Sequence, residues 1–192
     1  MIEINSFQCL NISELLKIYS ENELACILNR FKCNKNSEID TFLKNSAIDF
    51  NKKSQAITYL IFDCNDKLMG YFSLSLKPIM INSVVMSKSD LKKVLRISDL
   101  ELDNNTVSPA SYLIAQLGKD DRSSINIDII FDFINYFINE AKNICGGVVE
   151  FLESENSVKL IDMYKDRGFK TFNTRKSKSG EDRKLVQMYR LI

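Results

Sequence analysis

Proton-transfer chemistry in this chain is restricted by one absence: its 192 residues include no histidine. A Ser-His-Asp or Cys-His catalytic site and a histidine-ligated zinc site are therefore excluded. Any acid or base must be Asp, Glu, Tyr, Cys or Lys. The five cysteines are widely spaced and none lies in a CxxC pair. We therefore expect buried thiols in a reducing compartment and no metal site.

Composition limits the class of protein. Apolar residues make up 45% of the chain and charged residues 27%, which is typical of a globular domain, and the length fits a single domain over residues 1–192. No apolar run approaches the ~20 residues of a membrane helix, and the N-terminus lacks a secretory signal. We predict a cytoplasmic protein with no membrane contact. The net charge of +1 requires any nucleic-acid contact to be local.

The second half of the sequence alternates between strand and helix patterns. The apolar run at 110–118 is typical of a buried central strand, and Ile130, Phe133, Ile134 and Phe137 mark one helical face. We predict, in order, a strand at 110–118, a helix at 127–144, a strand at 148–152, a helix at 157–167 that Gly168 closes, and strands at 169–173 and 185–191 around a polar loop at 175–184. The fold class is α/β, or α+β with a mixed sheet.

The first half predicts fewer regular elements. Asn and Asp in residues 63–67 favour a turn between two strands. We predict a strand over Met1–Phe7, one broken helix or two short helices within 13–30, a helix at 38–51 that starts with a Ser37–Asp40 capping box, a hairpin of strands 56–62 and 68–76 that ends at Pro78, and a variable excursion at 80–107 with a short helix at 87–96.

The segment MYKDRGFK (163–170) resembles the closing signature of GNAT N-acetyltransferases. The strand ASYLIAQLGK (110–119) and the segment GGVVEFLESENSVKLIDMY (146–164) match the order and spacing of that superfamily. Upstream, FKCNKNSEIDTFLKNSAIDF (31–50) and TYLIFDCNDKLMGYFSLS (58–75) are similar to a bacterial subgroup that includes the acetyltransferase toxins of toxin-antitoxin pairs. The resemblance covers nearly everything except 80–107. It implies one GNAT domain with a central mixed sheet flanked by helices.

The resemblance also implies an acetyl-coenzyme A (acetyl-CoA) site along the central strand. An extended pantetheine arm can take the hydrogen bonds of a missing strand, and a backbone amide near Leu117 can stabilise the charge on the thioester oxygen. The cofactor-binding residues expected on this strand are Gln116, Leu117, Gly118 and Lys119. Because the acetyl donor is a thioester, no metal is required.

The pyrophosphate is expected at the stretch between strand and helix, where amides and the helix dipole favour anions. The family pattern is Gln/Arg-x-x-Gly-x-Gly/Ala. This chain instead has Arg122, Ser123, Ser124, Ile125, Asn126 and Ile127. Two outcomes stay open. Ser123, Ser124, Asn126 and the amides bind pyrophosphate with help from Lys119 and Arg122, or the cofactor site has been lost.

Three residues near the signature have roles implied by the resemblance. Tyr164 stands where many members carry a tyrosine that protonates the departing thiolate, although a half-buried packing tyrosine is the alternative. Asn156 stands where members bond the cofactor, or it caps the following helix together with Ser157. Glu153 could face the site as a general base, yet a solvated carboxylate or a base-free reaction would also fit.

The resulting prediction is an N-acetyltransferase that transfers the acetyl group of acetyl-CoA to a primary amine of a protein, a small molecule or an aminoacyl-tRNA. A toxin-like protein would also have an antitoxin or tRNA as partner, and a homodimer is a further option. The alternative is a binding module of the same fold that has lost the cofactor and acts through 80–107.

Overall fold

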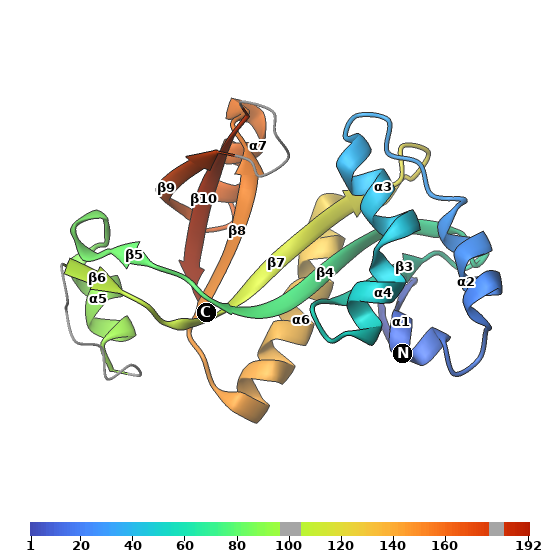
Figure 1. Cartoon of the computed structure of the whole chain (residues 1–192), viewed down its shortest axis with the longest axis horizontal. Coiled ribbons are helices and arrows are strands. Elements are labelled where there is room, and N and C mark those ends of the chain that lie inside the picture. The colour runs from blue at the N-terminus through green and yellow to red at the C-terminus, as the bar shows by residue number, and fades with distance from the viewer. Residues whose placement is uncertain (97–104, 177–182) are drawn as a thin grey trace. The chain divides into compact units, whose positions relative to one another are not determined.

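The computed structural model describes residues 1–96, 105–176 and 183–192. The chain divides into two compact units. Unit 1 consists of Met1–Ser75 and Ala115–Ala141, and unit 2 consists of Leu76–Ile114 and Lys142–Ile192. Three elements contribute residues to both units, namely β4 (Leu68–Pro78), β7 (Ala110–Lys119) and α6 (Ile127–Cys145) (Figure 1).

The strands of unit 1 follow the order β1 (Ile2–Ile4), β2 (Phe7–Asn11), β3 (Ile57–Phe62), β4 and β7, and β1 to β4 are antiparallel. The predicted hairpin is present as β3 and β4, and β4 ends at Pro78 as expected. The single strand predicted over Met1–Phe7 is wrong. A turn at Asn5 and Ser6, with φ of 49° and 65°, divides it into β1 and β2.

The helices that precede the hairpin are short. Residues 13–30 form two helices, α1 (Ile12–Leu15) and α2 (Glu21–Leu28), and the helix predicted at 38–51 is divided into α3 (Ser37–Asn45) and α4 (Ala47–Lys52). The break falls at Ser46, whose φ of −125° is not helical. The N-cap of α3 is Asn36, whose side chain accepts from the amides of Glu38 and Ile39, so the predicted capping box at Ser37 is also wrong.

Helices cover both faces of β4 in unit 1. The Phe72 ring lies 6.2 Å from that of Phe137 on α6, whereas the Tyr71 hydroxyl donates a 2.7 Å hydrogen bond to the carbonyl of Ile39 on α3. Because neighbouring side chains of a strand point to opposite faces, α6 and α3 lie on opposite sides of β4 (Figure 1). This packing positions the end of β7 and the loop that follows it.

Unit 2 has a mixed sheet in the order β7, β8 (Val149–Glu155), β10 (Lys184–Leu191) and β9 (Lys170–Lys176). The pair β7–β8 is parallel and the other two pairs are antiparallel. Helix α7 (Val158–Lys165) follows β8, and its C-cap is Asp166. Gly168, predicted to close this helix, has a φ of +84° in the turn that follows it. Gly146 and Gly147, which follow α6, also have positive φ.

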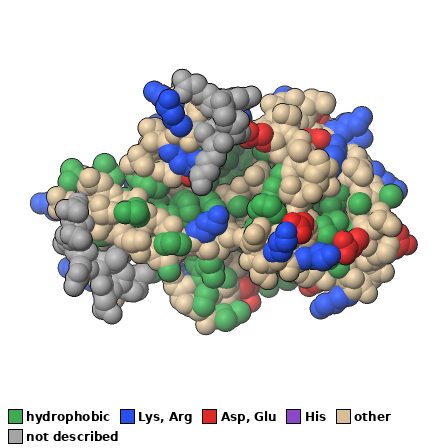
Figure 2. All heavy atoms as spheres, viewed as in Figure 1, with side chains coloured by type: hydrophobic (Ala, Val, Ile, Leu, Met, Phe, Trp, Pro, Cys, Tyr) green, Lys and Arg blue, Asp and Glu red, His purple; other side chains and the backbone are tan. Residues whose placement is uncertain are grey.

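The excursion forms a separate layer of unit 2. It holds β5 (Ile81–Asn82), the 3-10 helix η1 (Ser83–Val85), α5 (Lys88–Val94) and β6 (Thr106–Val107), while the predicted helix end at 95–96 lies beyond α5 and 97–104 lie outside the described residues. Its apolar residues join a core with Phe151 and Tyr189 of the sheet. On the opposite side Met80 and Val84 are exposed, and Figure 2 shows hydrophobic side chains on this surface.

Candidate functional site

Tyr164 lies on α7 and packs its ring against that of Phe169, with the ring centroids 5.9 Å apart in an edge-to-face arrangement. The residue is half-buried. Burial raises the pKa of Tyr164 to about 12, with Arg167 lowering it and Glu155 raising it to smaller extents. The phenol therefore keeps its proton at physiological pH and can donate it. Its placement after β8 agrees with the order of elements that the resemblance implies.

Glu153 of β8 is engaged in a polar cluster of unit 2. Arg175 Nε donates to Glu153 Oε1 at 2.7 Å, Arg175 Nη2 forms an ion pair with Oε2, and Gln187 Nε2 donates to Oε1 at 2.8 Å. Burial alone would raise the pKa of Glu153, but the hydrogen bonds from Arg175 and Gln187 lower it. A carboxylate held in this way is a weak base, so the geometry favours a structural ion pair over the predicted general base.

Asn156 is exposed in the turn between β8 and α7. The N-cap of α7 is Ser157, and its side chain makes no capping hydrogen bond. The predicted capping role of Asn156 with Ser157 is therefore wrong. The first amides of α7 are available to another acceptor, and the predicted contact of Asn156 with the cofactor stays a prediction.

The loop from Asp120 to Asn126, which connects β7 to α6, is folded around one carboxylate. Asp120 is fully buried, and its oxygens accept hydrogen bonds from the amides of Lys32 (2.9 Å) and Arg122 (2.8 Å) and from the Arg122 guanidinium (3.0 and 2.8 Å). Burial opposes ionisation, yet these bonds lower the pKa of Asp120. Arg122 Nη2 also donates to the carbonyl of Arg30. The Arg122 guanidinium is thus committed to the loop itself, rather than free to bind the predicted pyrophosphate.

Several loop amides are also engaged internally. The amide of Ser123 donates to the Asp120 carbonyl at 2.9 Å, and that of Ile125 donates to the Ser123 hydroxyl at 3.1 Å. The side chain of Ile125 is fully buried, so this departure from the family pattern serves the core of unit 1. Asn126 Oδ1 accepts from the amide of Asp128 at the first turn of α6. These bonds leave fewer amides for an anion than a glycine-rich loop offers.

Five of the predicted cofactor-binding residues are exposed: Lys119, Arg122, Ser124, Asn126 and Asn156. Lys119 at the end of β7 and Ser124 in the loop are exposed, and no hydrogen bond among the described residues engages the Lys119 ammonium or the Ser124 hydroxyl. Ile127 begins the 19-residue helix α6, whose N-terminus attracts anions. Lys119, Ser124 and this helix end fit a pyrophosphate better than Arg122 does.

The remaining predicted residues lie in the second half of β7. Gln116 and Leu117 are half-buried and Gly118 is buried. A Cβ atom at Gly118 would lie 2.6 Å from Ile39 and 2.6 Å from Tyr71, so packing alone explains this glycine. The parallel pairs of β7 with β8 run from Ser111–Val149 to Ile114–Leu152. The structure thus places 116–127 in unit 1 and Glu153, Asn156 and Tyr164 in unit 2.

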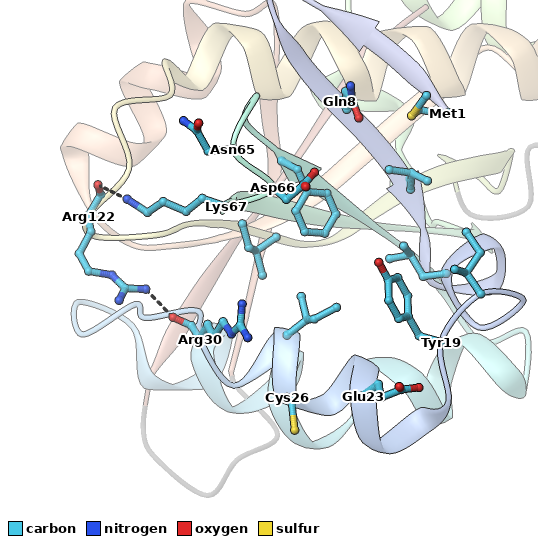
Figure 3. Close-up of a pocket in the computed structure, with 16 residues that line it drawn as sticks. Met1, Gln8, Tyr19, Glu23, Cys26, Arg30, Asn65, Asp66, Lys67 and Arg122 are labelled. Atoms are coloured by element: carbon cyan, nitrogen blue, oxygen red, sulfur yellow. Dashed lines mark hydrogen bonds between the residues drawn. The ribbon is translucent and has the colours of Figure 1, made fainter.

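A pocket of about 740 Å³ in unit 1 was not predicted from the sequence. Arg30, Lys67 and Arg122 gather at one end of it, and Met1 and Tyr19 lie at the other (Figure 3). The remaining walls combine apolar side chains with polar and acidic ones: Leu10, Leu15, Ile18, Ile27, Phe62 and Leu68, with Gln8, Glu23, Cys26, Asn65 and Asp66. The pocket would suit a ligand with an apolar body and polar groups. Its walls come from β2, α1, α2 and the β3–β4 hairpin, so no continuous motif could have indicated it.

The cysteines differ from the expectation. All five are free thiols, but Cys26, Cys64 and Cys145 are exposed and only Cys9 and Cys33 are buried. In the described ranges no group of acidic or cysteine side chains could hold a metal ion. No described helix has the length and apolarity to cross a bilayer.

Neither a protein-family model nor a curated protein matches this chain. Solved structures do. A tyrosine-to-phenylalanine mutant of KacT matches 95% of this chain and 94% of its own at 15% identity, with a TM-score of 0.67. AtaT complexed with acetyl-methionyl-tRNAfMet matches 94% and 93% at 16% identity, with a TM-score of 0.63. AtaTR bound with AcCoA matches 96% and 94% at 15% identity, with a TM-score of 0.56.

At these identities the likeness concerns the fold. It extends over nearly the whole of this chain and of each matched chain. The predicted fold, a central mixed sheet flanked by helices, is confirmed, and KacT and AtaT share it.

Proposed function

We propose that this protein is an N-acetyltransferase that uses acetyl-CoA to acetylate a primary amine. The observation that carries the proposal is Tyr164, a half-buried phenol on the helix that follows β8. The likeness to AtaTR bound with AcCoA adds a fold on which acetyl-CoA binds. The resemblance of MYKDRGFK gives Tyr164 its role.

The proposed reaction begins when a neutral amine attacks the thioester carbonyl. The nitrogen forms a bond to carbon, the carbonyl oxygen gains negative charge, and the amide near Leu117 stabilises that charge. The carbon–sulfur bond then breaks, and Tyr164 gives its proton to the departing thiolate. The proton that the amine loses goes to water, because Glu153 is held by Arg175 and Gln187. In this scheme Glu153 has a structural role on β8 and takes no part in proton transfer.

The proposal gives each predicted residue a role. The pyrophosphate is bound by Lys119, Ser123, Ser124, Asn126 and the start of α6 at Ile127, while Arg122 and Ile125 hold the loop in shape. Tyr164 protonates the thiolate, and Asn156, next to α7, contacts the cofactor. Gln116, Leu117 and Gly118 supply backbone along the pantetheine arm.

The acceptor to test first is an aminoacyl-tRNA, because AtaT complexed with acetyl-methionyl-tRNAfMet shares this fold. A protein or small-molecule amine is the second choice. The net charge of +1 requires tRNA to be bound by a local surface, and Figure 2 shows Lys and Arg mixed with Asp and Glu over unit 1. An antitoxin is the corresponding protein partner, as in the AtaT–AtaR complex, and a homodimer is a further proposal. The cytoplasm is the compartment in which these partners would be met.

Calorimetric titration with acetyl-CoA tests the first step. We expect saturable binding, and Tyr164→Phe should leave the affinity within about twofold of wild type because the phenol acts on the leaving thiolate. With radiolabelled acetyl-CoA and mixed aminoacyl-tRNAs, transfer by Tyr164→Phe should fall about a hundredfold. Equal transfer rates for Tyr164→Phe and wild type would remove Tyr164 from the mechanism.

The competing function is a binding module that has lost the cofactor. The internal bonds of Arg122 and the buried Ile125 favour it, because both reduce the room for an anion. Absence of calorimetric binding at millimolar acetyl-CoA would select this alternative. The exposed apolar residues of 80–107 would then be the surface to examine, starting with Met80 and Val84.

A further inference from the structure

Unit 2 contains a buried ion pair between β8 and β10, which contacts the turn that follows α7. Arg190 Nε on β10 donates a 2.6 Å hydrogen bond to Oε2 of Glu150 on β8. The Glu150 side chain is fully buried and that of Arg190 is 14% exposed. Oε1 of Glu150 has no hydrogen-bond partner among the described residues. An ion pair that leaves one buried oxygen unsatisfied is a poor source of stability, so another reason for its presence is needed.

Two further contacts of Arg190 involve the end of α7. Nη1 of Arg190 donates to the carbonyl of Arg167 at 3.1 Å. Its guanidinium carbon lies 4.6 Å from the centre of the Phe169 ring, in a cation–π arrangement. Glu150 accepts from Nε, which orients the guanidinium so that Nη1 reaches this turn.

The turn that Arg190 holds also fixes Tyr164. The carbonyl of Tyr164 accepts from the amides of Arg167 (3.0 Å) and Phe169 (3.1 Å). The Phe169 ring, which Arg190 covers, is the ring against which the Tyr164 side chain packs edge to face. A continuous set of contacts therefore runs from Glu150 through Arg190 and Phe169 to the phenol.

We propose that Arg190, oriented by Glu150, is a positioning residue that sets the orientation of the Tyr164 phenol through the Arg167 carbonyl and the Phe169 ring. The catalytic part of this inference rests on the proposed acetyl transfer. The structural part, the orientation of the Tyr164 ring, does not. Sequence patterns could not reveal the pair, since Glu150 and Arg190 are 40 positions apart on strands that read as ordinary amphipathic segments.

The test compares wild type with two variants in the full-length protein. Arg190→Met alone leaves the Glu150 charge buried and can unfold the chain, so the main variant combines Glu150→Met with Arg190→Met, which replaces the pair by apolar side chains of similar size. The matched control is Lys170→Met, which removes the Lys170–Asp90 ion pair of the same unit. Circular dichroism first establishes that all three proteins are folded.

Two readouts follow. The chain contains seven tyrosines, so it is labelled with 3-fluorotyrosine, and the fluorine signal of Tyr164 is assigned by its loss in Tyr164→Phe. We expect the double variant to shift and narrow this signal and to lower kcat by about ten- to a hundredfold, with the KM for acetyl-CoA within twofold. Lys170→Met should change neither the signal nor kcat.

The two readouts separate the inference from the proposed function. A Tyr164 fluorine signal that is identical in wild type and the double variant overturns the positioning role, whatever the rates are. A shifted signal in a protein that transfers no acetyl group supports the positioning of Tyr164 and counts against the acetyltransferase. A signal shift of equal size in Lys170→Met would also overturn the inference, because the effect would then be general to unit 2.

Discussion

The Arg122 guanidinium donates a hydrogen bond to each oxygen of the buried Asp120 carboxylate, from Nε to Oδ1 at 3.0 Å and from Nη2 to Oδ2 at 2.8 Å. The two residues are separated by one position, so the chain turns back on itself at Asp121, whose amide donates to the Lys32 carbonyl at 2.8 Å. The loop is thus tied to the segment before α3, and its shape does not depend on a bound anion.

Asp120→Ala should therefore destabilise the protein strongly. The substitution leaves the part-buried Lys32 amide without its acceptor, and a lost partner of this kind costs about 1–3 kcal/mol. The Arg122 guanidinium also loses its acceptor. The free energy of unfolding in urea measures the loss. Asp132→Ala, at an exposed position of α6, should stay within about 0.5 kcal/mol of wild type. Equal stabilities for the two variants would contradict a structural role for Asp120.

Comparison of Lys119→Met with Arg122→Met should show which of the two residues binds the cofactor and which stabilises the loop. Lys119 is exposed at the end of β7, so its loss should weaken acetyl-CoA binding about tenfold while leaving stability unchanged. Arg122 is bonded to the buried Asp120, so its loss should lower the free energy of unfolding. Calorimetry and urea unfolding of both variants give the comparison, with Lys35→Met as an exposed control. A larger loss of affinity in Arg122→Met would return Arg122 to the cofactor site.

Local sequence patterns predicted the elements whose ends are marked by glycines or by polar turn residues. The 127–144 helix has a continuous apolar face and stops at two glycines, and the hairpin around Asp63–Lys67 has a polar turn between β-rich runs. The missed turn at Asn5–Ser6 and the helix break at Ser46 contain neither glycine nor proline. Tertiary packing, rather than intrinsic preference, determines both, and a single sequence carries no signal for it.

The candidate site was predictable in position but not in its bonding. The order of strand, helix and MYKDRGFK located Tyr164 and the 119–127 stretch. The bonding of Arg122 depends on the contacts of Asp120 with Lys32, in the segment before α3, and with Met69 of β4. The Glu150–Arg190 pair depends on strand register. From the sequence alone, polar side chains in such segments are expected to be exposed to solvent, because the partners that bury them are not known.

The pH dependence of acetyl transfer should lack the decline that an ordinary tyrosine would cause. Tyr164 acts in its protonated form, which is lost only as pH rises through its pKa of about 12, whereas an unperturbed phenol loses its proton near pH ~10. We expect kcat/KM to stay level between pH 9 and 10.5, measured by release of coenzyme A. A decline centred near pH 10 would mean that the phenol is solvated in the free enzyme.

Acid should weaken the attachment of α5 through Asp90. Its carboxylate accepts hydrogen bonds from Lys170 (2.6 Å) and Tyr189 (3.1 Å). Burial alone would raise the pKa of Asp90, but these hydrogen bonds lower it. A lowered pKa in the folded state gives stability that is present above the unfolded value of about 3.9 and is lost as pH falls through the folded pKa. Asp90→Asn should thus cost about 1.5 kcal/mol at pH 7 and less at pH 3. Asp49→Asn, which removes an exposed pair with Lys53, is the control variant in urea unfolding at both pH values.

Gly118→Ala should test whether this glycine serves packing or the cofactor. An added methyl group would lie 2.6 Å from both Ile39 and Tyr71, and overpacking of this kind costs about 1–3 kcal/mol. Gly146→Ala is a useful comparison, because nothing lies within 4 Å of a Cβ atom there and only its φ of +74° is strained, at about 1 kcal/mol. Thermal unfolding should rank Gly118→Ala as the less stable variant. If Gly118→Ala instead kept full stability and lost acetyl-CoA binding, Gly118 would be required by the cofactor, and the close contact with Tyr71 would not be what excludes a side chain.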